Sequence, residues 1–314
     1  MPEYRALRAK HSFLECVGTP ALAAEITVQP IRRYGFDAAI LFCDILTIPE
    51  ALGVEVTFPT GGPRLRPTID CRANVEKLPV VDVCKELAYV GEAVTASRAA
   101  VGEEVALLGF SGAPFTLACY MVEGGGSKAW SKIRAMVHQP ESGLAELLEL
   151  LADAVIDYLM MQIDAGADAI QLFDSWAGQL RVSDYERLVL PGTMRILAAV
   201  RDRGVPSILF ARNPGHLLPS TLAAGASMVS LDWRIELEDA VALAAPLGVG
   251  LQGNLDPTEL FASPQHILER VRAMAAAVDG QTGYIVNLGH GVTPPTPLSG
   301  VQAFVDAVKG LTVG

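Results

Sequence analysis

Polar side chains stand at the ends of several apolar runs in this chain, and their types could support acid–base or charge-stabilising chemistry. Carboxylates stabilise positive charge or move protons, hydroxyl and imidazole groups donate hydrogen bonds, and arginine binds anions. In chain order these residues are Asp44, Ser111, Asp174, Ser175, Arg212, Asn213, Asp232, Trp233, Asn254 and His290. Helix capping is the alternative interpretation of each, since Asp, Ser and Asn favour strand-to-helix turns.

Asp44 is the strongest candidate because it interrupts the apolar run AILFCDIL, residues 39–46. The chain continues into the apolar residues Ile45 and Leu46, so we expect no first helical turn for this carboxylate to cap. A carboxylate placed in an apolar environment interacts more strongly with a neighbouring cation than a solvated one does. The pattern therefore favours a functional carboxylate at Asp44.

The segment GFSGAPFTLACYMVEGGGS, residues 109–127, combines glycines with aromatic residues. Glycine lets the backbone approach a ligand closely, while Phe110, Phe115 and Tyr120 supply flat apolar surface and one hydroxyl. The segment does not match the phosphate-binding patterns G-x-x-x-x-G-K-[ST] and G-x-G-x-x-G. It favours an aromatic ligand wall over a phosphate loop.

Composition and missing motifs narrow the class of protein. The chain has 314 residues, is 51% hydrophobic and carries a formal net charge of −11, which disfavours nonspecific binding to nucleic acid or anionic membrane. Five cysteines without a C-x-x-C pair favour free thiols and a cytoplasmic location. The sequence contains no H-x-C or H-E-x-x-H spacing, and its lysines avoid the predicted strand ends. We therefore predict neither a metal site nor Schiff-base chemistry.

Short apolar runs alternating with helix-like segments must position these side chains. Runs of this kind, apolar on both faces, are typical of a parallel sheet in an α/β fold. Seven are visible, at residues 38–42, 105–110, 168–173, 206–210, 227–233, 248–253 and 284–289. Residues 54–65 read instead as a hairpin with a Pro/Gly turn. We expect one domain, residues 1–314, but periodicity leaves a closed eight-stranded barrel and an open doubly wound sheet equally possible.

Two helix starts carry capping signals. Ser183 and Glu186 have the spacing of a capping box, and Asp256 followed by Pro257 resembles an N-cap with proline at the first helical position. We therefore predict that helical turns begin after Ser183 and after Asp256.

Several motifs, taken in order, carry a resemblance to a known family. They are FCDIL, GFSGAPFTLACYMVEGGGS, QLFDSWAG, LDW, QGNLDP and NLGHG. With these motifs the sequence resembles the uroporphyrinogen decarboxylase family over nearly its whole length. The resemblance implies a single-domain (β/α)8 TIM barrel and a homodimer. It also implies an enzyme that removes the four acetate carboxyls of uroporphyrinogen III, giving coproporphyrinogen III without metal or organic cofactor.

The same resemblance assigns roles to individual residues. It places catalytic residues at Asp44, Arg8 and Tyr120, and further substrate-binding residues at Ser175 and His290. The apolar walls of the macrocycle site fall on Ile40, Phe42, Phe110 and Phe173.

The chemistry implied by the family gives Asp44 a role. A pyrrole protonated at a ring carbon accepts the electron pair of the breaking C–C bond, and a desolvated carboxylate stabilises that cation. Asp44 would also accept the pyrrole N–H groups and so orient the macrocycle. The proton donor is left open between Arg8 and a bound water.

The sequence departs from the family pattern at its start. The family has an R-Q-A-G-R-Y segment immediately before the x-P-E-Y-R pattern found here, whereas this sequence begins at Met1. We expect a late start assignment or a shortened chain more than a genuinely truncated homologue, and in each case weaker binding of the eight-carboxylate substrate. Two alternatives remain open: an inactive truncated paralogue, and a cobalamin- or thiol-dependent methyltransferase of the same superfamily.

Overall fold

The computed structural model describes residues 1–212, 215–279 and 283–311. Its main sheet has seven strands, all parallel, in the order β1-β4-β5-β6-β7-β8-β9. The bounds are β1 Ala38–Ile40, β4 Ala106–Gly112, β5 Ala169–Asp174, β6 Ser207–Ala211, β7 Met228–Ser230, β8 Gly250–Leu255 and β9 Tyr284–Leu288. All seven apolar runs are thus confirmed as strands. The predicted hairpin is also confirmed, as the antiparallel pair β2 Glu55–Thr57 and β3 Arg64–Arg66.

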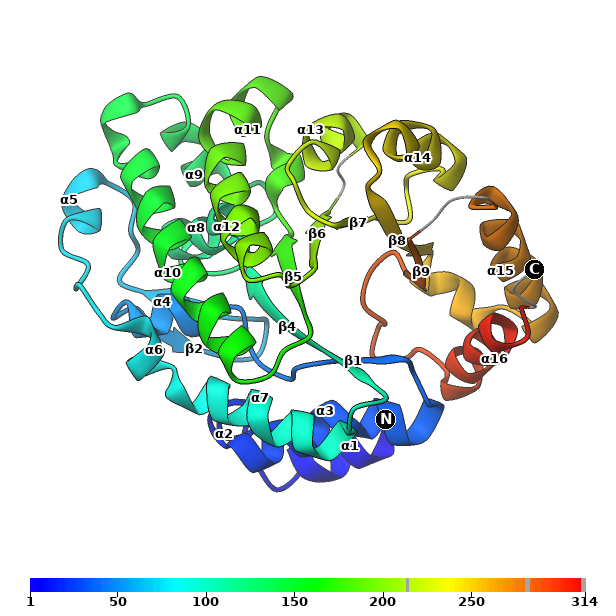
Figure 1. The fold of residues 1–314 in the computed structure, drawn as a ribbon. Coiled ribbons are helices and arrows are strands. Elements are labelled where there is room, and N and C mark those ends of the chain that lie inside the picture. The colour runs from blue at the N-terminus through cyan, green and yellow to red at the C-terminus, as the bar shows by residue number, and fades with distance from the viewer. Residues whose placement is uncertain (213–214, 280–282, 312–314) are drawn as a thin grey trace.

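Helices surround the convex face of the sheet (Figure 1). Those before β5 are α1 Pro2–Arg8, α2 Phe13–Gly18, α3 Pro20–Tyr34, α4 Thr47–Ala51, α5 Arg72–Val75, α6 Val83–Glu86, α7 Ala88–Val101, α8 Pro114–Glu123, α9 Ser131–Met136, the 3-10 turn η1 Pro140–Ser142 and α10 Leu144–Asp164. Those after β5 are η2 Ala177–Gln179, α11 Val182–Leu188, α12 Leu190–Asp202, η3 Gly215–Leu217, α13 Leu218–Leu222, α14 Leu237–Ala244, η4 Ala245–Leu247, η5 Pro257–Phe261, α15 Pro264–Ala277 and α16 Leu298–Lys309. Within the described ranges, no helix is long and apolar enough to cross a lipid bilayer.

The sheet curls into a barrel-type α/β fold, which confirms the predicted fold class. It has seven strands, one fewer than an ideal (β/α)8 barrel, and no ladder joins β1 to β9 among the described residues. The outer layer links the two ends of the chain, because the Lys309 side chain of α16 donates to the backbone oxygen of Tyr34 at the end of α3, 3.1 Å away. Figure 1 shows α16 near the end of α3.

Side chains on the two faces of the sheet differ in their surroundings. Ile170 and Leu172 of β5 are buried beneath the helices, whereas Ile40 of β1 is 44% exposed and Ile285 of β9 is 41% exposed. Buried apolar side chains form one large cluster around β1 and β4 to β6, and a second around β7 to β9 with α13 to α16. The convex face therefore carries most of the core, and the edges of the concave face stay open.

One of the two predicted helix starts is wrong. Helix α11 begins at Val182 with Arg181 as its N-cap residue, and Glu186 accepts a hydrogen bond from the Ser220 hydroxyl (2.8 Å) instead of forming a capping box with Ser183. The other start is confirmed, because Asp256 caps the 3-10 turn that begins at Pro257 by accepting from the Thr258 N–H. Glu186 thus binds Ser220, which is distant in sequence, and the predicted capping box at Ser183 does not form.

Candidate active site

The register of the strands defines one concave face that lines the barrel interior. Paired residues of neighbouring strands point to the same face, and each strand repeats that face every second residue. This face carries Ile40, Phe110, Gln171, Phe173, Phe210, Ser230, Gln252 and Ile285. The amide groups of Gln252 on β8 and Gln171 on β5 lie 3.5 Å apart although β6 and β7 separate their strands, so this face is the interior one.

Aromatic rings form a continuous row along the interior face near the strand ends. Phe173 lies 5.9 Å from Phe110 and 5.8 Å from Phe210, measured between ring centroids, and the His290 ring lies 6.0 Å from Phe210. Trp233 follows at 5.9 Å from His290. These near-perpendicular contacts build a stiff apolar wall that includes two of the predicted wall residues.

Asp44 lies half-buried just beyond β1, but it is not free of local structure. Its Oδ1 accepts the backbone N–H of Leu46 at 2.8 Å, and its backbone oxygen accepts from the Thr47 hydroxyl. Helix α4 begins at Thr47. The expectation that no helical turn follows Asp44 is therefore wrong, although the Asp44 carboxylate forms a turn with the Leu46 N–H and makes no cap hydrogen bond to α4. The other oxygen receives no hydrogen bond from the residues that the structure describes.

Burial raises the pKa of Asp44, and the negative charge of Glu50 adds to this, while the Leu46 N–H opposes it. Within the described part of the chain no cation forms an ion pair with Asp44. A desolvated carboxylate without a permanent partner is what a site needs in order to stabilise a cationic intermediate.

Tyr120 belongs to α8, and its ring packs against two indole rings from other segments. Its ring centroid is 5.6 Å from that of Trp130 and 6.3 Å from that of Trp176, and the two indoles are 4.5 Å apart. Burial raises the pKa of Tyr120 and the Asp44 charge raises it further, whereas Trp176 and Arg212 lower it. Tyr120 is therefore a neutral hydroxyl on which a negative and a positive group both act.

The end of β5 is tied to α8 by a buried carboxylate. Asp174 is fully buried, and its Oδ1 accepts from the Thr116 hydroxyl at 2.8 Å. The same hydroxyl oxygen accepts the backbone N–H of Trp176 at 3.3 Å. The half-buried Ser175 lies between Asp174 and Trp176, so this bridge fixes the backbone on both sides of a predicted substrate-binding residue.

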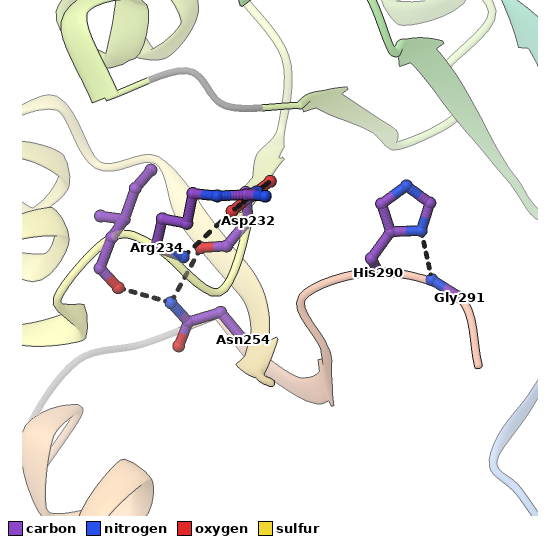
Figure 2. A network of polar contacts seen from close by, with 6 residues as sticks. Asp232, Arg234, Asn254, His290 and Gly291 are labelled. Carbon is purple, nitrogen blue, oxygen red and sulfur yellow. Dashed lines mark hydrogen bonds and ion pairs between the residues drawn. The ribbon is translucent and has the colours of Figure 1, made fainter. Parts of the chain in front are cut away.

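On the opposite side of the barrel, His290 faces a network anchored on β7 and β8 (Figure 2). The buried Asp232 binds the Arg234 guanidinium at 2.7 Å, and that guanidinium stacks 3.8 Å from the Trp233 ring centroid. Asn254 donates to the backbone oxygen of Asp232 and to that of Ile235. This network fixes the turn whose tryptophan packs against His290.

His290 is a neutral hydrogen-bond donor in this setting. Burial lowers its pKa, and the positive charges of Arg212 and Arg234 lower it further, although Asp232 opposes them. The His290 Nδ1 accepts the backbone N–H of Gly291 at 2.6 Å, which assigns the proton of the neutral ring to Nε2. The Nε2–H group can then donate to a ligand.

Arg8 and Phe42 lie on the N-terminal side of the site. The Arg8 guanidinium donates to the backbone oxygen of His11 at 2.6 Å and lies 5.7 Å from the Phe13 ring centroid. The Phe13 ring in turn packs against Phe42, 5.9 Å away. Arg8 is thus linked to the predicted wall, but it is not among the groups that shift the pKa of Asp44.

The structure groups most of the predicted residues. Tyr120 and Arg212 both contact the Trp176 ring, and His290 contacts Phe210 on the strand that precedes Arg212. The charge of Asp44 also acts on Tyr120. Ile40, Phe110 and Phe173 line the interior beside it, whereas Asn213 lies outside the described residues. Sequence reasoning assigned no role in the site to Thr116, Trp130, Trp176 or Phe210. The stretches FDSW and ILFAR contain Trp176 and Phe210, and the segment 109–127 contains Thr116, whereas no motif pointed to Trp130.

The described residues contain no group of three His, Cys, Asp or Glu side chains arranged to hold a metal ion.

The parallel sheet is curled, and polar and aromatic side chains gather at the carboxyl ends of its strands. These two features define the class of barrel-type α/β enzymes, which bind ligands at that edge. Residues 1–311 match the family model described as Uroporphyrinogen decarboxylase (URO-D). The chain belongs to this family.

Three relatives support the same assignment. The uroporphyrinogen decarboxylase of Saccharophagus degradans is 44% identical over 318 residues, covering 99% of this chain and 90% of that protein. That of Pseudomonas putida is 45% identical with the same coverage, and that of Trichlorobacter lovleyi is 42% identical, covering 99% of this chain and 91% of its own.

Solved structures of lower identity show the fold alone. A methyltransferase from Methanosarcina mazei aligns with a TM-score of 0.81 at 21% identity, covering 94% of this chain and 86% of the other. A B12-independent methionine synthase from a Shewanella species aligns with a TM-score of 0.63 at 12% identity, covering 92% and 85%. The much higher identity to the decarboxylases favours them over the methyltransferase alternative.

Proposed function

We propose that this chain removes the four acetate carboxyls of uroporphyrinogen III and gives coproporphyrinogen III. The observation that carries the proposal is the desolvated carboxylate of Asp44, which has no ion-pair partner within the described ranges and lies near the neutral hydroxyl of Tyr120. Full-length similarity to uroporphyrinogen decarboxylases supports the choice of substrate.

Each proposed step exchanges one carboxylate for one proton. A proton adds to a pyrrole ring carbon next to the acetate side chain, and the ring becomes cationic. The bond between the acetate methylene and its carboxylate then breaks, its electron pair neutralises the ring, and carbon dioxide leaves. Protonation of the exocyclic methylene gives the methyl group, and loss of the ring proton restores the pyrrole.

Asp44 is the proposed electrostatic partner of the cationic ring. Its second carboxylate oxygen, which receives no hydrogen bond from the described residues, would accept the pyrrole N–H groups and hold the macrocycle in place. The first proton comes from Arg8 or from a bound water. A fixed carboxylate in a poorly solvated site costs little reorganisation as the charge develops, which is why we assign it the main catalytic effect.

The remaining predicted residues bind the periphery of the substrate. Tyr120, Ser175 and His290 are proposed to donate hydrogen bonds to substrate carboxylates, while Ile40, Phe42, Phe110 and Phe173 contact the apolar faces of the pyrroles. The row of aromatic rings from Phe110 to Trp233 supports this division, because it supplies an apolar wall that includes the His290 ring.

Product analysis tests the proposed function. The purified chain is incubated anaerobically with uroporphyrinogen III, and both carbon dioxide and the oxidised porphyrin products are quantified. We expect four molecules of carbon dioxide per macrocycle and a tetracarboxylate product. Absence of carbon dioxide release by a folded protein would instead support the inactive-paralogue alternative.

The family resemblance also leads us to propose a homodimer in the cytoplasm. Light scattering after size exclusion tests the first point, with a mass near twice that of the 33.3 kDa chain expected. A monomer at micromolar concentration would contradict it.

A further inference from the structure

Arg212 occupies a fixed place at the carboxyl end of β6 that the proposed function does not yet use. Its backbone N–H donates to the backbone oxygen of Asp174 at the end of β5, 3.3 Å away. Its guanidinium carbon lies 5.6 Å from the ring centroid of Trp176. The side chain is half-buried against this indole, so its position is set by the sheet and by an aromatic contact.

The charge of Arg212 reaches two groups on opposite sides of the site. It lowers the pKa of Tyr120, which belongs to α8, and that of His290, which follows β9. Both groups are neutral donors at neutral pH. The Tyr120 ring lies 6.3 Å from the Trp176 ring that Arg212 contacts, and the His290 ring lies 6.0 Å from Phe210, two residues before Arg212. The guanidinium, the hydroxyl and the imidazole N–H are therefore donors that can serve one anion.

Arg212 differs from its neighbour Arg234 in how its charge is balanced. Arg234 binds Asp232 at 2.7 Å, whereas no carboxylate among residues 1–212, 215–279 and 283–311 lies within ion-pair distance of the Arg212 guanidinium. A guanidinium that is half-buried and has no carboxylate partner keeps its donors available for an anionic ligand. Since the chain carries a net charge of −11, the lack of such a partner at Arg212 is not caused by a shortage of carboxylates.

We propose that Arg212, together with the Tyr120 hydroxyl and the His290 Nε2–H group, forms a subsite for one side-chain carboxylate of the macrocycle. This inference rests on the proposed function and deepens it. A planar guanidinium binds a carboxylate through two parallel hydrogen bonds, which a hydroxyl or an imidazole cannot do.

The bound carboxylate is one that the reaction leaves in place. Decarboxylation sends the electron pair of the breaking bond toward the ring, and pairing a carboxylate with a guanidinium stabilises it against that loss. Asp44 and Arg212 act on Tyr120 with opposite charges, and the carboxylate is the one suited to the cationic ring. The subsite around Arg212 therefore holds a propionate while an acetate reacts near Asp44.

The test measures binding separately from turnover. Coproporphyrin III, a stable tetracarboxylate, is titrated into wild type, Arg212→Gln and Arg212→Lys by fluorescence, and KM for uroporphyrinogen III is measured in parallel. Arg272→Gln, which removes an exposed arginine on α15, is the matched control. We expect about tenfold weaker binding and a similar rise in KM for Arg212→Gln, a smaller effect for Arg212→Lys, and no change for the control.

Binding by both Arg212 variants at wild-type affinity, with native circular dichroism, would overturn the subsite. A fall in kcat at unchanged KM and unchanged affinity would also overturn it, because it would mean that Arg212 acts only in the transition state. An inactive wild type whose binding still depends on Arg212 would refute the proposed reaction and leave the subsite standing.

Discussion

The buried carboxyl of Asp174 should make the stability of this protein depend on pH in a way that one substitution can isolate. Burial raises the pKa of Asp174 from its ordinary 3.8 to about 6, although the Thr116 hydroxyl and the N–H groups of Ala177 and Trp176 oppose this. The Oδ2 atom of Asp174 has no hydrogen-bond partner among the described residues. The two N–H groups therefore act on the charge of the carboxylate without a hydrogen bond to this oxygen.

The sign follows from the raised pKa. Below pH 3.8 the carboxyl is protonated in both the folded and the unfolded chain, so its burial carries no ionisation cost. Between about pH 4 and 6 the unfolded chain loses the proton first, and stability falls until the folded carboxyl has ionised as well. A difference of about two pKa units corresponds to roughly 3 kcal/mol of unfolding free energy at neutral pH.

Asp174→Asn removes this titration and keeps an oxygen for the Thr116 hydroxyl. Urea unfolding of wild type and variant is followed by tryptophan fluorescence at pH 4, 5, 6 and 7. The unfolding free energy of the variant minus that of wild type should rise by about 3 kcal/mol from pH 4 to pH 7. Asp37→Asn, which changes an exposed aspartate, controls for the loss of one charge. A difference between Asp174→Asn and wild type that stays flat, or falls, across this range would refute the reasoning.

Three further substitutions test the site. Tyr120→Phe removes a hydroxyl but keeps the ring contacts, so KM for uroporphyrinogen III should rise several-fold with unchanged circular dichroism. Gly289→Ala places a Cβ against the backbone of Trp233 and should weaken coproporphyrin III binding, whereas Gly291→Ala on the other side of the same histidine meets open space and should not. Thr116→Val leaves buried polar groups unpaired and should lower the unfolding free energy by about 1–3 kcal/mol in urea.

The strands were predictable because their signal is local and repeated. A run such as AIQLFD is apolar enough to be buried on both faces, and only a central parallel strand accommodates that. The count of seven strands also came from such runs. How the sheet curls was not predictable from them, because curvature depends on the packing of helices such as α3 and α16 across the ends of the chain.

Asp44 shows where local reasoning fails. The apolar Ile45 and Leu46 hid the turn that follows, since this turn needs only the Leu46 N–H and does not depend on the leucine side chain. The interrupted apolar run and the family resemblance both identified the residue, but the expectation that no helical turn follows it was wrong. Its burial and its second carboxylate oxygen became visible only in three dimensions.

The remaining parts of the site depend on contacts between residues far apart in sequence. Thr116 and Asp174 are 58 positions apart, and Arg212 meets the Trp176 ring from another strand. No short motif encodes such a pair, because each partner alone is an ordinary strand-end or helix residue. The structure is needed to show that the cation at Arg212 and the hydroxyl at Tyr120 share one region.

The central claim is that the Asp44 carboxylate stabilises positive charge that develops on the substrate during the reaction. Single-turnover release of carbon dioxide from uroporphyrinogen III by Asp44→Asn, at saturating enzyme, tests it most directly. The rate should fall by about 10²–10³-fold, while coproporphyrin III still binds and the circular dichroism spectrum is unchanged. Release at the wild-type rate by this neutral variant would contradict the account.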